Sequence, residues 1–234
     1  MTRNVIAVLI IVLIFFLIYI ITLDTTKLLP IKRMGQTKII TSRHLKDIIS
    51  NNYYFSIWYN IPGIKRNSNS EYTLLKWYLY DQQGNCESVK ENSPTKISIS
   101  VNHNLNHMVV DLGTGKYHRV QIYDIPLDDW NNVIVNLNNN IVDVYINGEL
   151  RKTSIVHNLT STKNKGSSSL CVGNSDLKGF IGNVKFGNES ISTEDAYSIY
   201  KDGLGENPVK SMFDRYRLKL SIEKKNNELS SLEI

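Results

Sequence analysis

Residues 128–153 constrain the fold of this chain more than any other stretch, because they combine alternating hydrophobic residues with an Asn-Gly pair. Every second residue is hydrophobic in two segments, at Val133, Val135 and Leu137 and again at Val142, Val144 and Ile146. Successive side chains of a strand point to opposite faces, so each segment predicts a strand with one buried face. Asn147-Gly148 follows the second segment, and this pair is favoured in the type I′ turns of hairpins. The pattern predicts an antiparallel meander that packs on a second sheet, with Trp130 buried where they meet.

The same stretch resembles the central hairpin of laminin-G-like (concanavalin A-like) jelly-roll domains, in which a Trp opens one strand and Tyr-x-Asn-Gly closes the next. Here these residues are Trp130, Tyr145, Asn147 and Gly148. The resemblance extends to four flanking segments, residues 54–58, 170–173, 179–186 and 191–195. It implies an all-β, two-sheet antiparallel jelly-roll sandwich over residues 51–205. This scaffold serves lectins, hydrolases, adhesion modules and virion parts, so the resemblance does not imply one function.

An apolar run precedes this domain. Val5–Leu23 contains no charged residue, and its 19 residues match the roughly 30 Å hydrocarbon core of a bilayer. No small-x-small cleavage site follows, so residues 1–23 are predicted to form an uncleaved transmembrane helix that anchors the chain. Residues 24–50 are rich in Lys and Arg and are predicted to be a juxtamembrane connector. Its charges either contact anionic lipid headgroups or serve only to set the topology.

The orientation of the anchor follows from the charges on its two sides. Arg3 is the only charged side chain before the run, whereas six Lys and Arg residues lie within residues 24–50. This distribution favours the cytosolic side for the large domain. Cys86 and Cys171 fit that side if they are free thiols, which we favour, although a disulfide stays open. Two glycosylation sequons, at Asn158 and Asn188, indicate the opposite side.

One helical pattern ends the predicted jelly-roll domain and a second one follows it. Ser192 and Asp195 approximate a capping box, which predicts a short helix from Thr193 to about Gly203. In the tail, residues 206–234, hydrophobic residues share one helical face at Val209, Met212, Phe213, Tyr216 and Leu220. The tail is therefore predicted to form an amphipathic helix that continues weakly to Leu232. Met212, Phe213 and Tyr216 are its candidate interaction residues, facing either the sandwich or a partner protein.

The chemistry of known classes of site limits the possible functions. Residues 51–205 contain 14 Lys and Arg against 15 Asp and Glu, which argues against nucleic-acid binding. The paired carboxylates of a glucanase are missing, so the protein is predicted not to be an enzyme. His103 and His107 could share a strand face, but no third zinc ligand stands at a suitable spacing. No cofactor is predicted, although Asp111 or Asp176 could contribute to a Ca²⁺ site.

Sugar binding on such a fold would use aromatic platforms beside amide and carboxylate side chains. Trp77 and Tyr145 are the candidate platform residues, drawn from a wider set with Tyr53, Tyr78, Tyr80 and Tyr117. Aromatic residues in strands more often pack in a core or on a sheet face, and that alternative stays open.

Two functions are compatible with the sequence. The first is a non-catalytic, membrane-anchored structural or protein-interaction module. An anchored jelly roll with a sequence rich in Asn, Lys and Ile resembles the membrane-anchored minor structural proteins of large DNA viruses. The resemblance implies capsid-shell proteins and the bilayer as partners and the virion inner membrane as location. The alternative is a membrane-tethered lectin that faces outward and binds glycans. The side of the membrane on which the domain lies distinguishes them.

Overall fold

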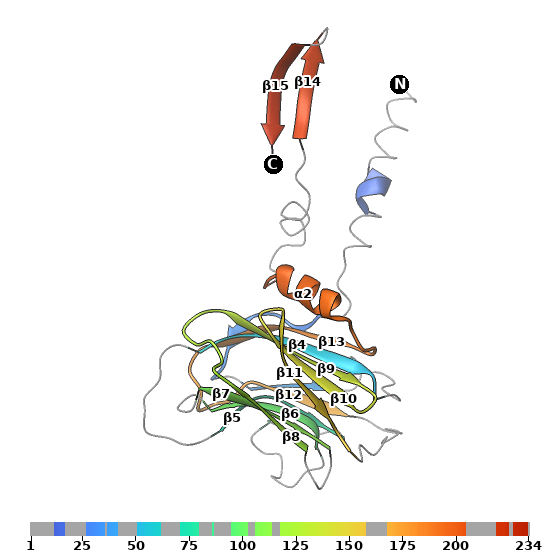
Figure 1. Ribbon diagram of the computed structural model, residues 1–234. Helices are drawn as coiled ribbons and strands as arrows, with labels where there is room; N and C mark the ends of the chain where they lie inside the picture. Colours follow the sequence, from blue (N-terminus) through green and yellow to red (C-terminus); the bar gives the residue numbers. More distant parts are fainter. Residues whose placement is uncertain are drawn as a thin grey trace. The chain divides into compact units, whose positions relative to one another are not determined.

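Two antiparallel β-sheets pack face to face between residues 26 and 204 (Figure 1). The computed structural model describes residues 12–16, 27–35, 37–41, 51–61, 71–79, 86, 95–102, 106–113, 118–157, 168–204, 219–224 and 227–233. Residues 26–204 form one unit, and the two ends of the chain, 1–25 and 205–234, form another. The all-β, two-sheet antiparallel sandwich predicted from the sequence is confirmed.

The larger sheet has seven strands and contains the predicted meander. Its order is β1 (Lys27–Leu29), β13 (Phe180–Gly187), β4 (Tyr53–Asn60), β9 (Asn131–Asn138), β10 (Ile141–Ile146) and β11 (Glu149–Ile155), with β2 (Lys32–Arg33) also pairing with β13. The smaller sheet has six strands. Its order is β3 (Lys38–Thr41), β12 (Ser169–Val172), β5 (Tyr72–Tyr78), β6 (Thr95–Asn102), β7 (His107–Leu112) and β8 (His118–Tyr123).

The meander has the register that its alternation predicts. Val135 pairs with Val144 and Val133 with Ile146, and these side chains are buried between the sheets. Asn147 and Gly148 both have positive φ, 52° and 79°, as a type I′ turn requires. A Cβ atom on Gly148 would lie 3.0 Å from the rings of Tyr197 and Tyr200, so this turn also needs glycine for close packing.

Aromatic side chains from both sheets form a cluster in the core. Tyr53 and Phe55 of β4 and Phe186 of β13 surround Trp77 of β5, with ring centroids 5.3 to 6.0 Å from that of Trp77. Tyr53, Phe55 and Trp77 have no exposed surface. These rings come from both sheets. They stabilise the sandwich because they bury a large apolar surface and make edge-to-face contacts.

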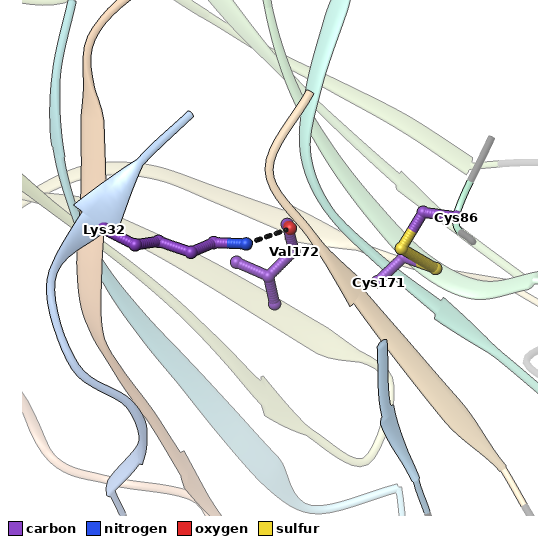
Figure 2. Close-up of a disulfide and its surroundings, with 4 residues drawn as sticks. All are labelled: Lys32, Cys86, Cys171 and Val172. Atoms are coloured by element: carbon purple, nitrogen blue, oxygen red, sulfur yellow. Dashed lines mark hydrogen bonds between the residues drawn. A yellow bond between two sulfur atoms is a disulfide. The ribbon is translucent and has the colours of Figure 1, made fainter. Parts of the chain in front are cut away.

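The sandwich begins earlier than the sequence predicts. Residues 27–41, which were assigned to the juxtamembrane connector, supply strands to both sheets, and Leu29, Met34 and Ile40 are buried. Lys32, on a strand of the larger sheet, donates a hydrogen bond of 3.1 Å to the carbonyl of Val172 in the smaller sheet (Figure 2). These strands are two to four residues long and carry lysines, so their period is too short to detect in the sequence.

The predicted short helix is present as α2 (Thr193–Lys201), with Ser192 as N-cap and a complete capping box with Asp195. It lies on the outer face of the larger sheet, where Ala196 packs with Tyr54, Ile134 and Tyr145 (Figure 1). At its other end, Tyr200 stacks on Trp58 with ring centroids 5.7 Å apart. The helix therefore covers part of one face of the sandwich.

The two ends of the chain differ in part from the prediction. β14 (Lys219–Lys224) pairs with β15 (Asn227–Glu233), so the predicted helical continuation to Leu232 is wrong. Leu220 and Ile222 alternate with polar residues, and this period of two outweighs the weak helical pattern. Met212, Phe213 and Tyr216 lie outside the described residues. Most of Val5–Leu23 does too; residues 12–16 are helical, and no helix within the described residues is long and apolar enough to cross a membrane.

Candidate functional site

Four side chains form a row across one end of the larger sheet, on its outer face. In strand order they are Arg33, Phe180, Asn60 and Trp130. Phe180 pairs directly with Arg33 on one side and with Asn60 on the other, so these three side chains share a face. Trp130 immediately precedes β9, which is the neighbour of β4. We call these four residues the aromatic row.

The two rings of the aromatic row are close together and partly exposed. The ring centroids of Trp130 and Phe180 are 6.2 Å apart with an interplanar angle of 41°. Phe180 is 41% exposed, and Trp130 is half-buried. The expectation that Trp130 is buried between the sheets is therefore wrong. Trp130 lies one residue before the first strand pair, and Ile57 and Val133 fill the interior there instead.

Asparagine side chains hold the segment that presents Trp130. The Asn131 side chain donates to the carbonyl oxygens of Pro126 and Asp129, at 3.2 and 2.9 Å, and accepts from Asn147 at 2.9 Å. Asp128 has a φ of 65°, a conformation that Asp tolerates better than most residues. Asp128 and Asp129 are both exposed beside Trp130. The hairpin turn and the presenting segment are thus one hydrogen-bonded unit.

The aromatic row combines the chemical groups that recognise a polar ligand with apolar faces. Phe180 and Trp130 offer ring faces, the Asn60 amide can donate and accept, and Arg33 and the neighbouring carboxylates offer charge. A small number of fixed polar groups around aromatic surface gives a binding site its orientation and specificity. The aromatic row therefore presents the groups that a ligand with apolar faces and polar edges would contact.

A buried lysine lies on the other sheet. Lys96 is 7% exposed, and its Nζ lies 4.6 Å from the ring centroid of Trp77 and 4.8 Å from that of Tyr53. Burial lowers its pKa to about 8. The negative faces of the two rings attract the ammonium group, and this attraction offsets part of its lost hydration energy.

A family model described as "Concanavalin A-like lectin/glucanases superfamily" matches residues 40–196, more than half of the chain. The chain belongs to this superfamily. The first part of the match begins within β3, in agreement with the early start of the sandwich. No curated protein matches the chain.

Solved structures share the superfamily fold at low identity. The receptor-binding domain of botulinum neurotoxin D is 19% identical, with a TM-score of 0.57 over 75% of this chain and 44% of that one. The ligand-binding domain of botulinum neurotoxin serotype D in complex with N-acetylneuraminic acid is 16% identical, with a TM-score of 0.53 over 75% and 46%. The chain spans less than half the length of these structures, and the likeness is one of fold.

The two residues predicted to form an aromatic platform for a glycan are not at the surface. Trp77 has no exposed surface and Tyr145 is 2% exposed, beneath α2. Their rings are therefore closed to a glycan in this structure. Phe180, which the sequence analysis did not select, is the partner that makes Trp130 part of a surface. The alternation of the strand could have identified Phe180, because its neighbour Ile181 points into the core and Phe180 therefore points outward.

The candidate metal ligands are placed apart. His107 is 5% exposed, its ring packs on Tyr123, and neither ring nitrogen has a hydrogen-bond partner among the described residues. His103 lies outside the described residues. Asp111 is engaged by Arg119 through two hydrogen bonds of 2.9 Å, and Asp176 lies in an exposed turn. Within the described ranges, no three His, Cys, Asp or Glu side chains form a group that could hold a metal ion.

The two cysteines form a disulfide, Cys86–Cys171, with Cα atoms 5.6 Å apart (Figure 2). The preference for free thiols is therefore wrong, and the alternative that the sequence left open is confirmed. Sequence separation of 85 residues hid the pairing, because only the fold brings the two Cα atoms within bonding range.

Proposed function

We propose that this protein is a non-catalytic, membrane-anchored binding module that recognises carbohydrate through the aromatic row. The observation that carries the proposal is the partly exposed pair of rings, Trp130 and Phe180, on the two sides of the strand that ends with Asn60. The superfamily includes lectins, and this surface has the composition of a sugar-binding surface on such a scaffold.

The chemistry of a sugar matches this surface. One face of a pyranose ring presents C–H groups that pack on aromatic rings, and its edge presents hydroxyl groups. The hydroxyls can donate to the carboxylates of Asp128 and Asp129 and can accept from the Asn60 amide or from Arg33. Rings are held by few rotatable bonds, so ordering them on binding costs little entropy. The opposite charges at the two ends of the row suit a ligand with a defined direction.

The similar solved structures agree with a binding role. They are described as receptor-binding and ligand-binding domains, and one contains N-acetylneuraminic acid. An acidic sugar would place its carboxylate at Arg33, away from Asp128 and Asp129. A neutral sugar would use both ends of the aromatic row.

A glycan array with the detergent-solubilised full chain tests the proposal. Trp130→Ala and Phe180→Ala are each expected to lower affinity for the bound glycan at least tenfold, while the melting temperature shows that the domain stays folded. Tyr123→Ala is the matched control, because Tyr123 is 59% exposed on the other sheet. Equal binding by all three variants would remove the aromatic row from the function.

The second candidate is a structural tether between a membrane and a protein shell, such as a minor capsid protein in a virion. The apolar run Val5–Leu23 and the hydrophobic residues Met212, Phe213 and Tyr216 favour it. Under this proposal, replacing these three tail residues with Ser releases the protein from its assembly, whereas Trp130→Ala does not. The bilayer is a partner in both proposals.

A further inference from the structure

We propose that the sandwich lies on the oxidising, non-cytosolic side of its membrane and that Asn188 is modified there with an N-linked glycan. The disulfide Cys86–Cys171 is the first observation. It uses both cysteines of the chain, so no free thiol remains. Disulfides persist in secretory and extracellular compartments and are rare in the cytosol. The bond therefore places the domain opposite to the side that the charge distribution favours.

The lysines that follow the apolar run are part of a folded domain, and the length of that domain limits their effect on orientation. Lys27, Lys32 and Lys38, counted as connector charges, belong to β1, β2 and β3 of the folded sandwich. Lys32 is half-buried and bonded to the carbonyl of Val172. The segment that follows the apolar run is also long, residues 24–234, and long domains translocate largely regardless of their charge. The disulfide is then the stronger indicator.

Asn188 is placed where an acceptor asparagine must be. It begins the sequon Asn188-Glu189-Ser190, with no proline in the middle position. It directly follows the end of β13 at Gly187, in a bend before α2, and both Asn188 and Glu189 are exposed. An exposed bend lets the amide enter an enzyme without unfolding a strand.

The modification would leave the aromatic row open. Phe180 is the first residue of β13 and Asn188 follows its last, so the two are about 25 Å apart along an extended strand. A glycan at Asn188 therefore projects from the opposite end of the strand. It would keep that end of the larger sheet hydrated without covering the proposed binding surface.

The reaction needs a lipid diphosphate-linked oligosaccharide and a membrane-bound oligosaccharyltransferase. A bond forms between Nδ2 of Asn188 and C1 of the first sugar. The bond between C1 and the diphosphate oxygen breaks, and the lipid diphosphate leaves with its electron pair. The proton released from the amide goes to a base of the transferase, so no oxidant or reductant is consumed.

Translation of the full chain in the presence of eukaryotic microsomes tests the proposal. The expected product shows a mobility shift that endoglycosidase removes. The shift decreases by one glycan in Asn188→Gln and in Ser190→Ala, two variants that remove the sequon by different changes. The glycan at Asn188 is retained in Asn158→Gln, the matched control in the second sequon. After alkylation with a membrane-permeable thiol reagent, non-reducing peptide mapping is expected to find the Cys86 and Cys171 peptides linked.

Three outcomes would overturn the proposal or part of it. An unshifted product with both cysteines alkylated places the domain in the cytosol. A shift that depends on Asn158 and not on Asn188 keeps the orientation and rejects the modification site. An unshifted, disulfide-bonded product that is protected from added protease likewise rejects the modification at Asn188. None of these results depends on whether the aromatic row binds sugar.

Discussion

Lys96 lies in the core because of a β-bulge in the pairing of β5 with β6. Trp77 pairs with Ile97 and the next residue, Tyr78, pairs with Thr95, so Lys96 is the extra residue on its strand. Ile97 and Ile99 face the core, and a regular strand would turn Lys96 to the opposite face. A bulge changes the direction of the side chain that it contains. The lysine therefore enters the aromatic part of the core instead of solvent.

Lys96→Met is expected to flatten the pH dependence of stability. Burial lowers the pKa of Lys96 from 10.5 to about 8, so between these values the unfolded chain binds a proton that the native state does not. Stability therefore rises with pH in this window and is lowest below it. The variant should lose up to about 1.4 kcal/mol per pH unit of this slope. Urea unfolding at a series of pH values measures it.

Other titrating groups also change the stability with pH and limit the pH range of the urea series. Lys32 also has a pKa lowered to about 8, by burial and then by Lys38, so a residual slope is expected in Lys96→Met. Burial raises the pKa of Tyr53 and Tyr59, which makes stability fall again above about pH 10. The series should therefore stay between about pH 7 and 9.5. Lys152→Met, at an exposed site on β11, is the control, and an equal slope in both variants would contradict the account.

At the scale of elements, asparagines attach α2 to the larger sheet at both ends. The Asn136 side chain donates to the carbonyl of Ile191 at 3.0 Å and accepts from its N–H at 2.9 Å. Beyond the other end, the Asn183 side chain donates to the carbonyl of Gly203 at 2.8 Å. Asn136 is 2% and Asn183 1% exposed. Amide side chains on the outward face of a sheet thus position a helix that buries few residues of its own.

Asn136→Ala is expected to destabilise the protein by about 1–3 kcal/mol, because it leaves the N–H and C=O of Ile191 without their partner. The amides of α2 should exchange faster with deuterium, since that end of the helix is no longer attached. Asn138→Ala is the control, because Asn138 is exposed at the end of the same strand. Unchanged exchange in α2 would show that the packing of Ala196 and Tyr200 is sufficient.

At the scale of the molecule, the disulfide links a segment between two strands of the smaller sheet to its strand β12. Cys171 lies on β12 and Cys86 between β5 and β6. The bond closes a loop of 85 residues. Closing so long a loop removes conformations from the unfolded chain, which stabilises the folded state by about 4.6 kcal/mol in the chain-entropy model.

Replacing both Cys86 and Cys171 with Ala is therefore expected to lower the free energy of unfolding by about 4.6 kcal/mol, a large share of the stability of a typical domain. Chemical denaturation of the two proteins measures the difference. Reduction of the wild-type protein should have a similar effect, because it opens the same loop. A reduced protein as stable as the oxidised one would contradict this account.

The sequence by itself determined the features that depend on neighbours along the chain. The alternation around Val133 and Val144, the Asn147-Gly148 turn and the Ser192 capping box were all predicted and are all present. Each is governed by the local period of side chains or by the conformations open to one or two residues. These features were also sufficient to predict the superfamily, because its characteristic hairpin is formed by residues close together in the sequence.

The tertiary structure decided what depends on pairing between distant residues. β3 exists because Lys38–Thr41 pairs with Ser169–Val172, and Lys96 is buried because of a register shift between two strands. Trp130 became part of a surface only through Phe180, which another strand brings alongside. A hydrophobic residue in the sequence shows that it can be buried. Which face, partner and depth it takes is set by contacts that form only when the whole sandwich closes.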